Sequence, residues 1–422
     1  MKETYFRRGL GLKKEIEPVL AAEYHSGLVE EMKAGGFALQ VGEVTIRLAK
    51  DFGFCYGVDR AVDYAYQTTF RFPDRRIFLV GEIIHNPHVN RRLRDAGVTF
   101  LYPADGQFDF SGITADDVVI LPAFGVTIAD FQRLRDIGCI LIDTTCGSVL
   151  NVWKRVESYA RDGFTAVIHG KAFHEETRAT ASQAFTHPGG RYLIVRDMAE
   201  ARTVCDFIEA NASAIPRDAF LARFADKASA GFEPDRDLVR IGVANQTTML
   251  ATESLAIAAE IGRSLASRYG EEHVAEHFRS FDTICSATQE RQDAVLELMR
   301  NPPDVMVVIG GYNSSNTNHL AHLCREYTAT YHVEDAACID ADAGTIRHKP
   351  ELAPDAPEVV THGWLPGGAV SIGLTAGAST PNVKIGQAIE RILATRGLEP
   401  PAAAAVAAVA DGNGGAGTRP AD

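Results

Sequence analysis

The chain has 422 residues, a net charge of −13 at pH 7 and 46% hydrophobic residues. This composition is typical of a soluble globular protein, and the length predicts roughly two to four domains. The acidic balance argues against nucleic acid as a partner, because neutralising phosphates requires a basic surface. No apolar run reaches the ~18 residues that a membrane span needs, so we expect no membrane insertion.

The seven cysteines are an odd number and widely scattered, unlike the disulfide framework of a small secreted protein. Residues 1–16 mix arginine, lysine and glutamate without a continuous apolar core, unlike a signal peptide. We therefore expect a cytoplasmic protein. Four cysteines fall within apolar strand or helix patterns and are interpreted as packing residues: Cys139, Cys205, Cys324 and Cys338.

In chain order, residues 1–43 carry an amphipathic helical pattern and are predicted to be an extension packed on the outside. Short apolar runs then alternate with helical patterns, which indicates parallel sheets covered on both faces. Three α/β units are expected, at residues 44–135, 136–277 and 278–396. The second unit carries a predicted insertion near 210–237, and 397–422 is expected to be a disordered tail, because it lacks periodicity.

One pattern occurs three times: a strand, a cysteine, a helix and a second strand that ends in glycine 24 to 26 residues after the cysteine. The three cysteines are Cys55, Cys146 and Cys285. Polar residues follow each glycine, beginning at His85, His174 and Asn313. This self-similarity predicts three related units, each offering one thiol and one polar loop. Each thiol lies at a helix start, where free backbone N–H groups favour a thiolate.

In parallel α/β sheets, ligands bind beyond the carboxyl ends of the strands, and all of these loops follow a strand. Three copies around a shared centre are therefore expected to bring the three thiols into one cavity. Such thiols could hold an iron–sulfur cluster, zinc or no metal. The close Cys-x-x-Cys pairs of structural zinc sites are absent. A cluster held by three thiolates leaves one iron open to a substrate, and we favour this interpretation.

The polar loops also have two interpretations. Ser314, Ser315 and Asn316 precede a helix and could be N-caps, but helix N-termini with such residues also bind phosphate, which we favour. Glu176 could cap the helix that begins near Thr177. Buried near a metal and an anion, it would instead have a raised pKa and deliver a proton at neutral pH.

Eight segments between residues 45 and 395 resemble motifs of the LytB family of 4-hydroxy-3-methylbut-2-enyl diphosphate reductases. In order they are GFCYGVDR (53–60), IHNPHV (84–89), DTTC (143–146), HEE (174–176), QTT (246–248), DTICSATQ (282–289), NSSNTN (313–318) and TAGAS (375–379). The resemblance implies a trefoil of three pseudo-threefold-related α/β units around one [4Fe–4S] cluster. The implied cluster ligands are Cys55, Cys146 and Cys285.

The resemblance further implies reductive dehydroxylation of this allylic diphosphate to isopentenyl and dimethylallyl diphosphate, the last step of the methylerythritol phosphate pathway to isoprenoids. Glu176 would relay the proton, assisted by Thr247 or Thr248. A ferredoxin or flavodoxin is implied as the electron donor. The residues implied to hold the diphosphate are His85, His174, Ser314, Asn316 and Ser379, with Ser315 nearby.

Two positions depart from the pattern of many bacterial members. Phe124 stands where they have histidine, and Gly147 where they have proline, so the chain is more similar to the plant and cyanobacterial branch. Phe124 affects the expected geometry of phosphate binding but not the reaction. Two other functions fit the same thiols: an iron–sulfur hydro-lyase, which needs no reductant, and a non-enzymatic iron–sulfur redox sensor, which needs neither Glu176 nor the phosphate loops.

Overall fold

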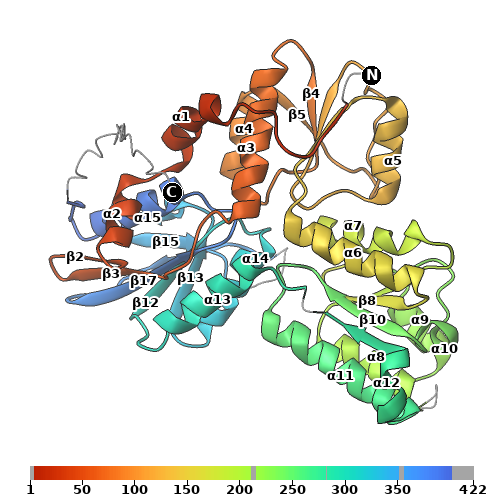
Figure 1. Ribbon diagram of the computed structural model, residues 1–422. Helices are drawn as coiled ribbons and strands as arrows, with labels where there is room; N and C mark the ends of the chain where they lie inside the picture. Colours follow the sequence, from red (N-terminus) through yellow and green to blue (C-terminus); the bar gives the residue numbers. More distant parts are fainter. Residues whose placement is uncertain (1–3, 211–214, 282, 351–355, 402–422) are drawn as a thin grey trace, which may run out of the picture.

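The computed structural model describes residues 4–210, 215–281, 283–350 and 356–401. Three α/β lobes lie around a common centre, and each is built on its own sheet (Figure 1). This arrangement confirms the predicted fold of three α/β units. Across the described ranges, every helix is too short or too polar to span a lipid bilayer.

The first lobe contains a five-stranded parallel sheet. In sheet order its strands are β1 (Tyr5–Phe6), β7 (Ile140–Asp143), β6 (Val118–Leu121), β4 (Ile77–Val80) and β5 (Val98–Leu101). The helices of this lobe are α3 (Tyr56–Arg71), α4 (Pro87–Asp95) and α5 (Ile128–Ile137). Ala61 and Val62 on α3 share a buried apolar cluster with Leu79 of β4, so α3 covers one face of this sheet.

The second lobe contains a four-stranded parallel sheet. In sheet order its strands are β11 (Phe278–Ser280), β10 (Ile241–Asn245), β8 (Thr165–His169) and β9 (Tyr192–Val195). Its helices are α6 (Gly147–Arg161), α7 (Glu175–Ser182), α8 (Met198–Ala210), α9 (Arg217–Arg223), α10 (Pro234–Asp237), α11 (Ala251–Tyr269) and α12 (Val274–His277), with 3-10 helices η1 (Gln183–Thr186) and η2 (Glu271–His273). Val156 of α6 and Ile261 of α11 belong to separate buried clusters, because these helices pack on opposite faces of the sheet.

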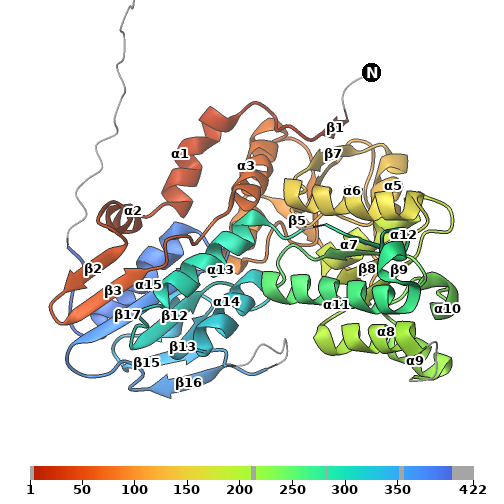
Figure 2. The same ribbon diagram turned by 60° about the horizontal axis from the view of Figure 1, so that its bottom comes forward.

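The third lobe contains a five-stranded sheet that is parallel except for one edge strand, β2. In sheet order its strands are β13 (Ala329–Val333), β12 (Val305–Ile309), β17 (Val370–Ala376), β3 (Val44–Leu48) and β2 (Ala38–Val41). Its helices are α13 (Ser286–Leu298), α14 (Ser315–Arg325) and α15 (Asn382–Ala394), with the 3-10 helix η3 (Ala336–Cys338). A small antiparallel sheet of β14 (Ile339–Asp340), β15 (Thr345–His348) and β16 (Val359–His362) lies beside this lobe (Figure 2).

The sheets divide the chain differently from the predicted unit boundaries. The strand before each cysteine pairs with the sheet of the preceding lobe: β3 with the third, β7 with the first and β11 with the second. The helix after each cysteine packs on the next sheet, as predicted. Each cysteine therefore lies where the chain crosses from one lobe to the next. These crossings are at the centre of the molecule, so the three cysteine turns come together there.

Residues 4–43 are integrated into the fold rather than packed on its outside, which corrects the prediction. Strand β1 pairs with β7 in the first sheet, and β2 pairs with β3 in the third. Between these strands, α1 (Lys13–Tyr24) buries Ile16 in the first core, and α2 (Gly27–Ala34) buries Met32 in the third core. The predicted amphipathic pattern is confirmed, but the apolar faces of α1 and α2 pack into the first and third cores.

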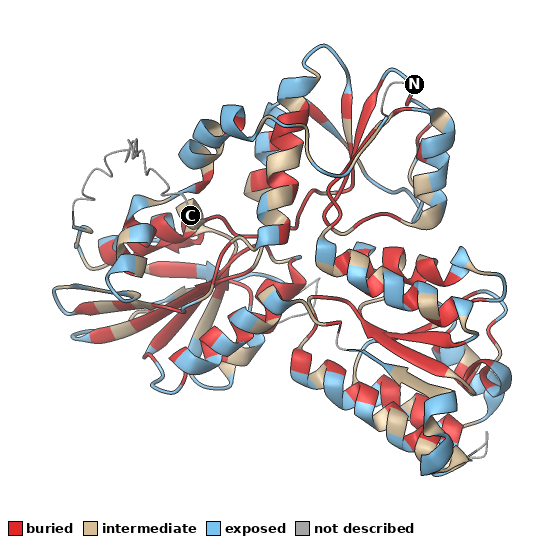
Figure 3. Cartoon of the chain, in the orientation of Figure 1, coloured by how far each residue is buried: buried red, intermediate tan, exposed pale blue. Residues whose placement is uncertain are grey.

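The predicted insertion near 210–237 forms part of the second core over its described residues. Phe220, Phe224 and Phe232 are buried there against Phe207 of α8. Residues 211–214 of the insertion, and the predicted tail from residue 402 onward, lie outside the described residues. Figure 3 shows that buried residues run along the strands of all three lobes, as expected for sheets covered on both faces.

We predict that Ile16→Ala lowers the free energy of unfolding by about 2–5 kcal/mol, because it leaves a cavity in a closed core. The exposed neighbour Glu17 provides the matched control, Glu17→Ala, which should change stability little. Urea denaturation of both variants measures the difference. Equal stabilities would mean that α1 is only a peripheral attachment.

Candidate functional site

One central cavity, with a volume of about 80 Å³, lies where the three lobes meet. All of the predicted site residues line it, and they come from all three lobes. They are Cys55, His85, Cys146, His174, Glu176, Thr247, Thr248, Cys285, Ser314, Ser315, Asn316 and Ser379. The loops that carry them follow the carboxyl ends of parallel strands, which explains why residues so distant in sequence converge.

The three predicted cysteine ligands occupy equivalent places, as N-cap residues of α3, α6 and α13. Each faces the neighbouring turn: a Cβ on Gly57 would lie 2.5 Å from Sγ of Cys146, and Oγ of Ser148 donates a hydrogen bond to Sγ of Cys285 at 3.3 Å. Position 57 therefore requires glycine, because any side chain would displace a thiol.

The spacing of the thiols distinguishes between kinds of metal site. Within the described part of the chain, only one group of three His, Cys, Asp or Glu side chains has all its ligand atoms within 4.8 Å of one another, and it contains no cysteine. A single zinc ion with Zn–S bonds of about 2.3 Å would require the sulfur atoms to lie closer to one another than this limit. A donor set of three separated thiols suits a larger group, such as an iron–sulfur cluster.

Burial raises the pKa of the Cys55 and Cys146 thiols, while backbone N–H groups of α3 and α6 oppose this effect. Thiols with raised pKa values are poor free nucleophiles, and a metal that binds them has to displace the proton. The other predicted cysteines, Cys139, Cys205, Cys324 and Cys338, are all buried, which agrees with a packing role.

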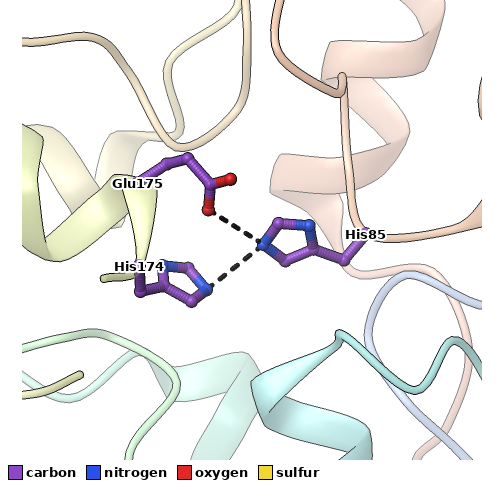
Figure 4. A group of neighbouring side chains, drawn as sticks. All are labelled: His85, His174 and Glu175. Atoms are coloured by element: carbon purple, nitrogen blue, oxygen red, sulfur yellow. Dashed lines mark hydrogen bonds and ion pairs between the residues drawn. The ribbon is translucent and has the colours of Figure 1, made fainter. Parts of the chain in front are cut away.

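Two buried histidines meet at the centre of the cavity, and their hydrogen bonds define which nitrogens carry protons (Figure 4). The backbone N–H of Glu176 donates to Nδ1 of His174 at 3.2 Å, so the proton of a neutral His174 lies on Nε2. That Nε2–H donates to Nε2 of His85 at 3.2 Å, and Nδ1–H of His85 donates to Glu82 at 3.2 Å. Burial, His85 and Lys171 lower the pKa of His174 well below its usual range, which keeps it neutral.

Among the residues that the structure describes, His85, His174 and Glu175 form the one compact group with ligand atoms close enough for a single metal ion. Because Nε2 of His174 is protonated in this network, it is a hydrogen-bond donor rather than a metal ligand. The Glu175 carboxylate is 3.6 Å from Nε2 of His85, beyond hydrogen-bonding distance, and its side chain is half exposed. Together these contacts suit an anion, which could replace His85 as the acceptor of the His174 Nε2–H, better than a cation.

The N-terminus of α14 offers further donors. Oγ of Ser314 caps the helix by accepting from the backbone N–H of Thr317, so the N-cap interpretation holds for this residue. Oγ of Ser315 and Nδ2 of Asn316 are buried and have no hydrogen-bond partner among the described residues. Unpaired buried polar atoms are costly, and a bound anion at a helix N-terminus would satisfy both.

Ser379 follows β17, and its Oγ donates to the backbone C=O of His85 at 3.1 Å. Phe124 follows β6 and takes the corresponding place in the first lobe. Its ring stacks on His85 with centroids 4.2 Å apart and meets the edge of His174 at 5.7 Å. Phe124 therefore adds no polar group to the site but restricts the orientation of both histidines.

Glu176 lies in the first turn of α7 and is almost fully buried. It does not cap that helix, because His174 is the N-cap residue; instead it accepts a hydrogen bond from the backbone N–H of Thr247 at 2.6 Å. Burial raises the pKa of Glu176 to about 7, although this hydrogen bond opposes the shift. The carboxyl group can therefore carry a proton near neutral pH.

Two residues near this carboxyl group had no role assigned in the sequence analysis. Gln246 is fully buried: its Oε1 accepts from Thr177 Oγ1 at 3.0 Å and from the N–H of Lys171 at 3.1 Å, and its Nε2 donates to Thr248. It fixes the Thr247–Thr248 loop against α7. Lys171 directly follows Gly170, the glycine after β8. The strand–glycine pattern in the sequence could therefore have shown that this loop carries a cation. Burial lowers its pKa.

We predict that Glu176 makes stability depend on pH. Its pKa is raised from 4.5 to about 7, so the stabilisation is complete below about pH 4.5 and is lost as the pH rises to about 7. The loss is about 3 kcal/mol at most. Thermal unfolding between about pH 5 and pH 8 should therefore show a smaller decrease in Tm for Glu176→Gln than for the wild type. Identical pH profiles would contradict the raised pKa.

Comparison with known proteins assigns the family. The family described as LytB protein matches residues 46–393. A 4-hydroxy-3-methylbut-2-enyl diphosphate reductase from Thermosynechococcus vestitus is 48% identical over 397 residues, covering 94% of this chain and 96% of that protein. The reductase from Gloeobacter violaceus is 47% identical over 401 residues, covering 94% of both chains.

Two solved structures are also similar. One, of (E)-4-hydroxy-3-methyl-but-2-enyl diphosphate reductase, has a TM-score of 0.50 and 27% identity, covering 82% of this chain and 98% of that one. The structure of the Plasmodium falciparum reductase has a TM-score of 0.58 at 19% identity, covering 82% of this chain and 87% of that one, and supports the fold alone. From the match over most of its length, the chain belongs to the LytB protein family.

Proposed function

We propose that the chain catalyses the reductive dehydroxylation of 4-hydroxy-3-methylbut-2-enyl diphosphate. Two electrons and two protons convert the substrate to isopentenyl or dimethylallyl diphosphate and water, the last step of the methylerythritol phosphate pathway. The observation that carries the proposal is the convergence of three thiols, unpaired anion-binding groups and a protonatable carboxyl group in one cavity. The family relationship supports the same reaction.

In this proposal Cys55, Cys146 and Cys285 hold one [4Fe–4S] cluster per chain. Their separation and their places at three helix N-termini fit a group larger than a single ion. When bound, the cluster supplies the electrons and, at the iron that lacks a cysteine ligand, a Lewis acid for the substrate hydroxyl group. The protein supplies the remaining steps.

The protein groups that bind the diphosphate are those that can donate hydrogen bonds at the base of the cavity. His174 donates from Nε2, and the N-terminus of α14 contributes Ser315 and Asn316, whose free polar atoms gain partners when the anion binds. Phe124 keeps the histidine rings in position. The full set of proposed diphosphate ligands is His85, His174, Ser314, Ser315, Asn316 and Ser379.

Glu176 is the proposed proton donor. With a pKa of about 7 it is substantially protonated at neutral pH, and it shares the cavity with the thiols. It can give its proton to the hydroxyl group so that the oxygen leaves as water. Thr247 orients the carboxyl group through its backbone N–H, and the adjacent Thr248 hydroxyl is held by Gln246.

The electron donor that we propose is a ferredoxin or flavodoxin in the cytoplasm. The seven cysteines are free of disulfides, which suits a reducing compartment. Small redox partners bind weakly and transiently, so the interface is expected to be small. The three cysteine residues are partly exposed at the centre, so a small electron donor could approach them.

The test is an anaerobic assay of protein reconstituted with iron and sulfide. With reduced viologen and the hydroxy-diphosphate, we expect dye oxidation and the appearance of both isoprenyl diphosphates. Product formation without dye oxidation would indicate a hydro-lyase. A bound cluster with neither product nor dye oxidation would indicate a redox sensor.

In the same assay, Glu176→Gln should bind the cluster and substrate but lose turnover by about 10²–10⁴-fold. The exposed control Glu157→Gln, on α6, should retain full activity.

We also predict which cysteines are required for the visible absorption of the cluster. Replacement of Cys55, Cys146 or Cys285 by serine should abolish or strongly reduce it, because thiolates are the preferred ligands of the cluster iron. Cys324→Ser should leave it intact, since Cys324 is buried in the core of the third lobe. Absorption spectra and iron content of the four variants decide the ligand set. Bleaching by Cys324→Ser would refute it.

A further inference from the structure

Arg291, on α13, is a buried cation next to the thiol centre. Only 3% of the residue is exposed, which is rare for arginine unless it is paired. Its Nη2 donates to the backbone C=O of Gly53 at 2.7 Å, and its Nη1 donates to the C=O of Ala287 at 2.7 Å. Nη1 also forms an ion pair with Asp51 at 3.1 Å, and Nε is buried without a partner among the described residues.

These contacts join two of the cysteine turns. Ala287 is two residues after Cys285, and Gly53 is two residues before Cys55. Gly53 has φ +77°, and a Cβ there would lie 2.9 Å from Oδ1 of Asn382, so the turn is tightly constrained. The guanidinium group is therefore a fixed link between the turn of the first thiol and the helix of the third.

The other two cysteine helices place an arginine in a similar way. Arg60 on α3 donates to the C=O of Thr145, the residue before Cys146, at 3.1 Å. Arg155 on α6 lies over the ring of Phe281, four residues before Cys285, at 4.0 Å. The helix that follows each cysteine thus contacts the segment that precedes another cysteine. Helix α3 contacts the segment before Cys146, α6 the segment before Cys285, and α13 the segment before Cys55. Of the three arginines only Arg291 is buried, so its charge is the least screened by water.

A buried positive charge at this position acts on the thiol centre. The Asp51 counter-charge is 40% exposed and is therefore partly screened by solvent. A cluster held by three thiolates is anionic and gains negative charge when it is reduced. Its potential depends on nearby charge, so a buried cation favours the reduced form.

We propose that Arg291 is a positioning residue that aligns the Cys55 turn with α13, and that its positive charge raises the reduction potential of the bound cluster. This inference rests on the proposed function, because it requires the cluster. Arg291 does not touch the reacting atoms. Its fixed positive charge favours reduction of the bound cluster by an electron donor. This effect does not depend on the diphosphate site.

The test compares Arg291→Gln and Arg291→Lys with the half-buried control Arg47→Gln, which removes one positive charge from β3, where Arg47 donates to the C=O of Asn301. The midpoint potential is measured by redox titration of the reconstituted protein, followed by electron paramagnetic resonance. Arg291→Gln should shift the potential to more negative values, and Arg291→Lys should stay near the wild type. Iron release to a chelator should be about tenfold faster in Arg291→Gln, as expected for loss of a charge-assisted hydrogen bond.

Asp51→Asn supplies an independent test that leaves Arg291 in place. It removes the counter-charge, so the potential should shift to more positive values, opposite to Arg291→Gln. This variant decides the proposal even when Arg291→Gln fails to retain its cluster. Unchanged potentials in both variants, or equal negative shifts in Arg291→Lys and Arg291→Gln, would overturn the charge role. Absence of the cluster from the wild type would instead refute the proposed function, and this inference with it.

Discussion

The three thiols have to meet at one point, although they are separated by long stretches of sequence. The fold meets this constraint by letting the chain leave one sheet, turn at a cysteine and cover the next sheet with the following helix. The three lobes are consequently linked by the turns that carry the thiols. At the Cys55 and Cys146 turns, the helix N-terminus directs backbone N–H groups toward the sulfur, which counteracts part of the cost of burying a thiolate.

Anion binding and proton transfer both depend on the orientation of a few buried polar groups in this centre. His174 caps α7 with one nitrogen and donates with the other, while Glu176 two residues further on accepts from the Thr247 backbone. The apolar ring of Phe124 packs on the histidines and excludes water from them. A low-dielectric environment thereby strengthens the donors toward an anion and keeps the carboxyl group protonated near neutral pH.

Local sequence patterns were sufficient to predict the central strands, the cysteine helices and the polar loops, because each depends on periodicity within a short window. The edge strands β1 and β2 and the small sheet of β14 to β16 were not predicted. They were also sufficient to predict that Glu176 and the loop residues converge. The pairing of β3, β7 and β11 with preceding sheets could not be predicted, because apolar parallel strands carry no local signal that selects one neighbour over another. The contacts of Gln246 and Arg291 were missed for a similar reason, since their partners are distant in sequence.

Residues 4–41 also cover the edges of two sheets, in addition to packing α1 and α2 on the cores. Strands β1 and β2 are edge strands of two different sheets, the first and the third. They cover backbone N–H and C=O groups of β7 and β3 that would otherwise be open to pairing with another chain. A protein shortened at this end would expose two unpaired strand edges on adjacent lobes, so the segment protects these two sheets against edge-to-edge association.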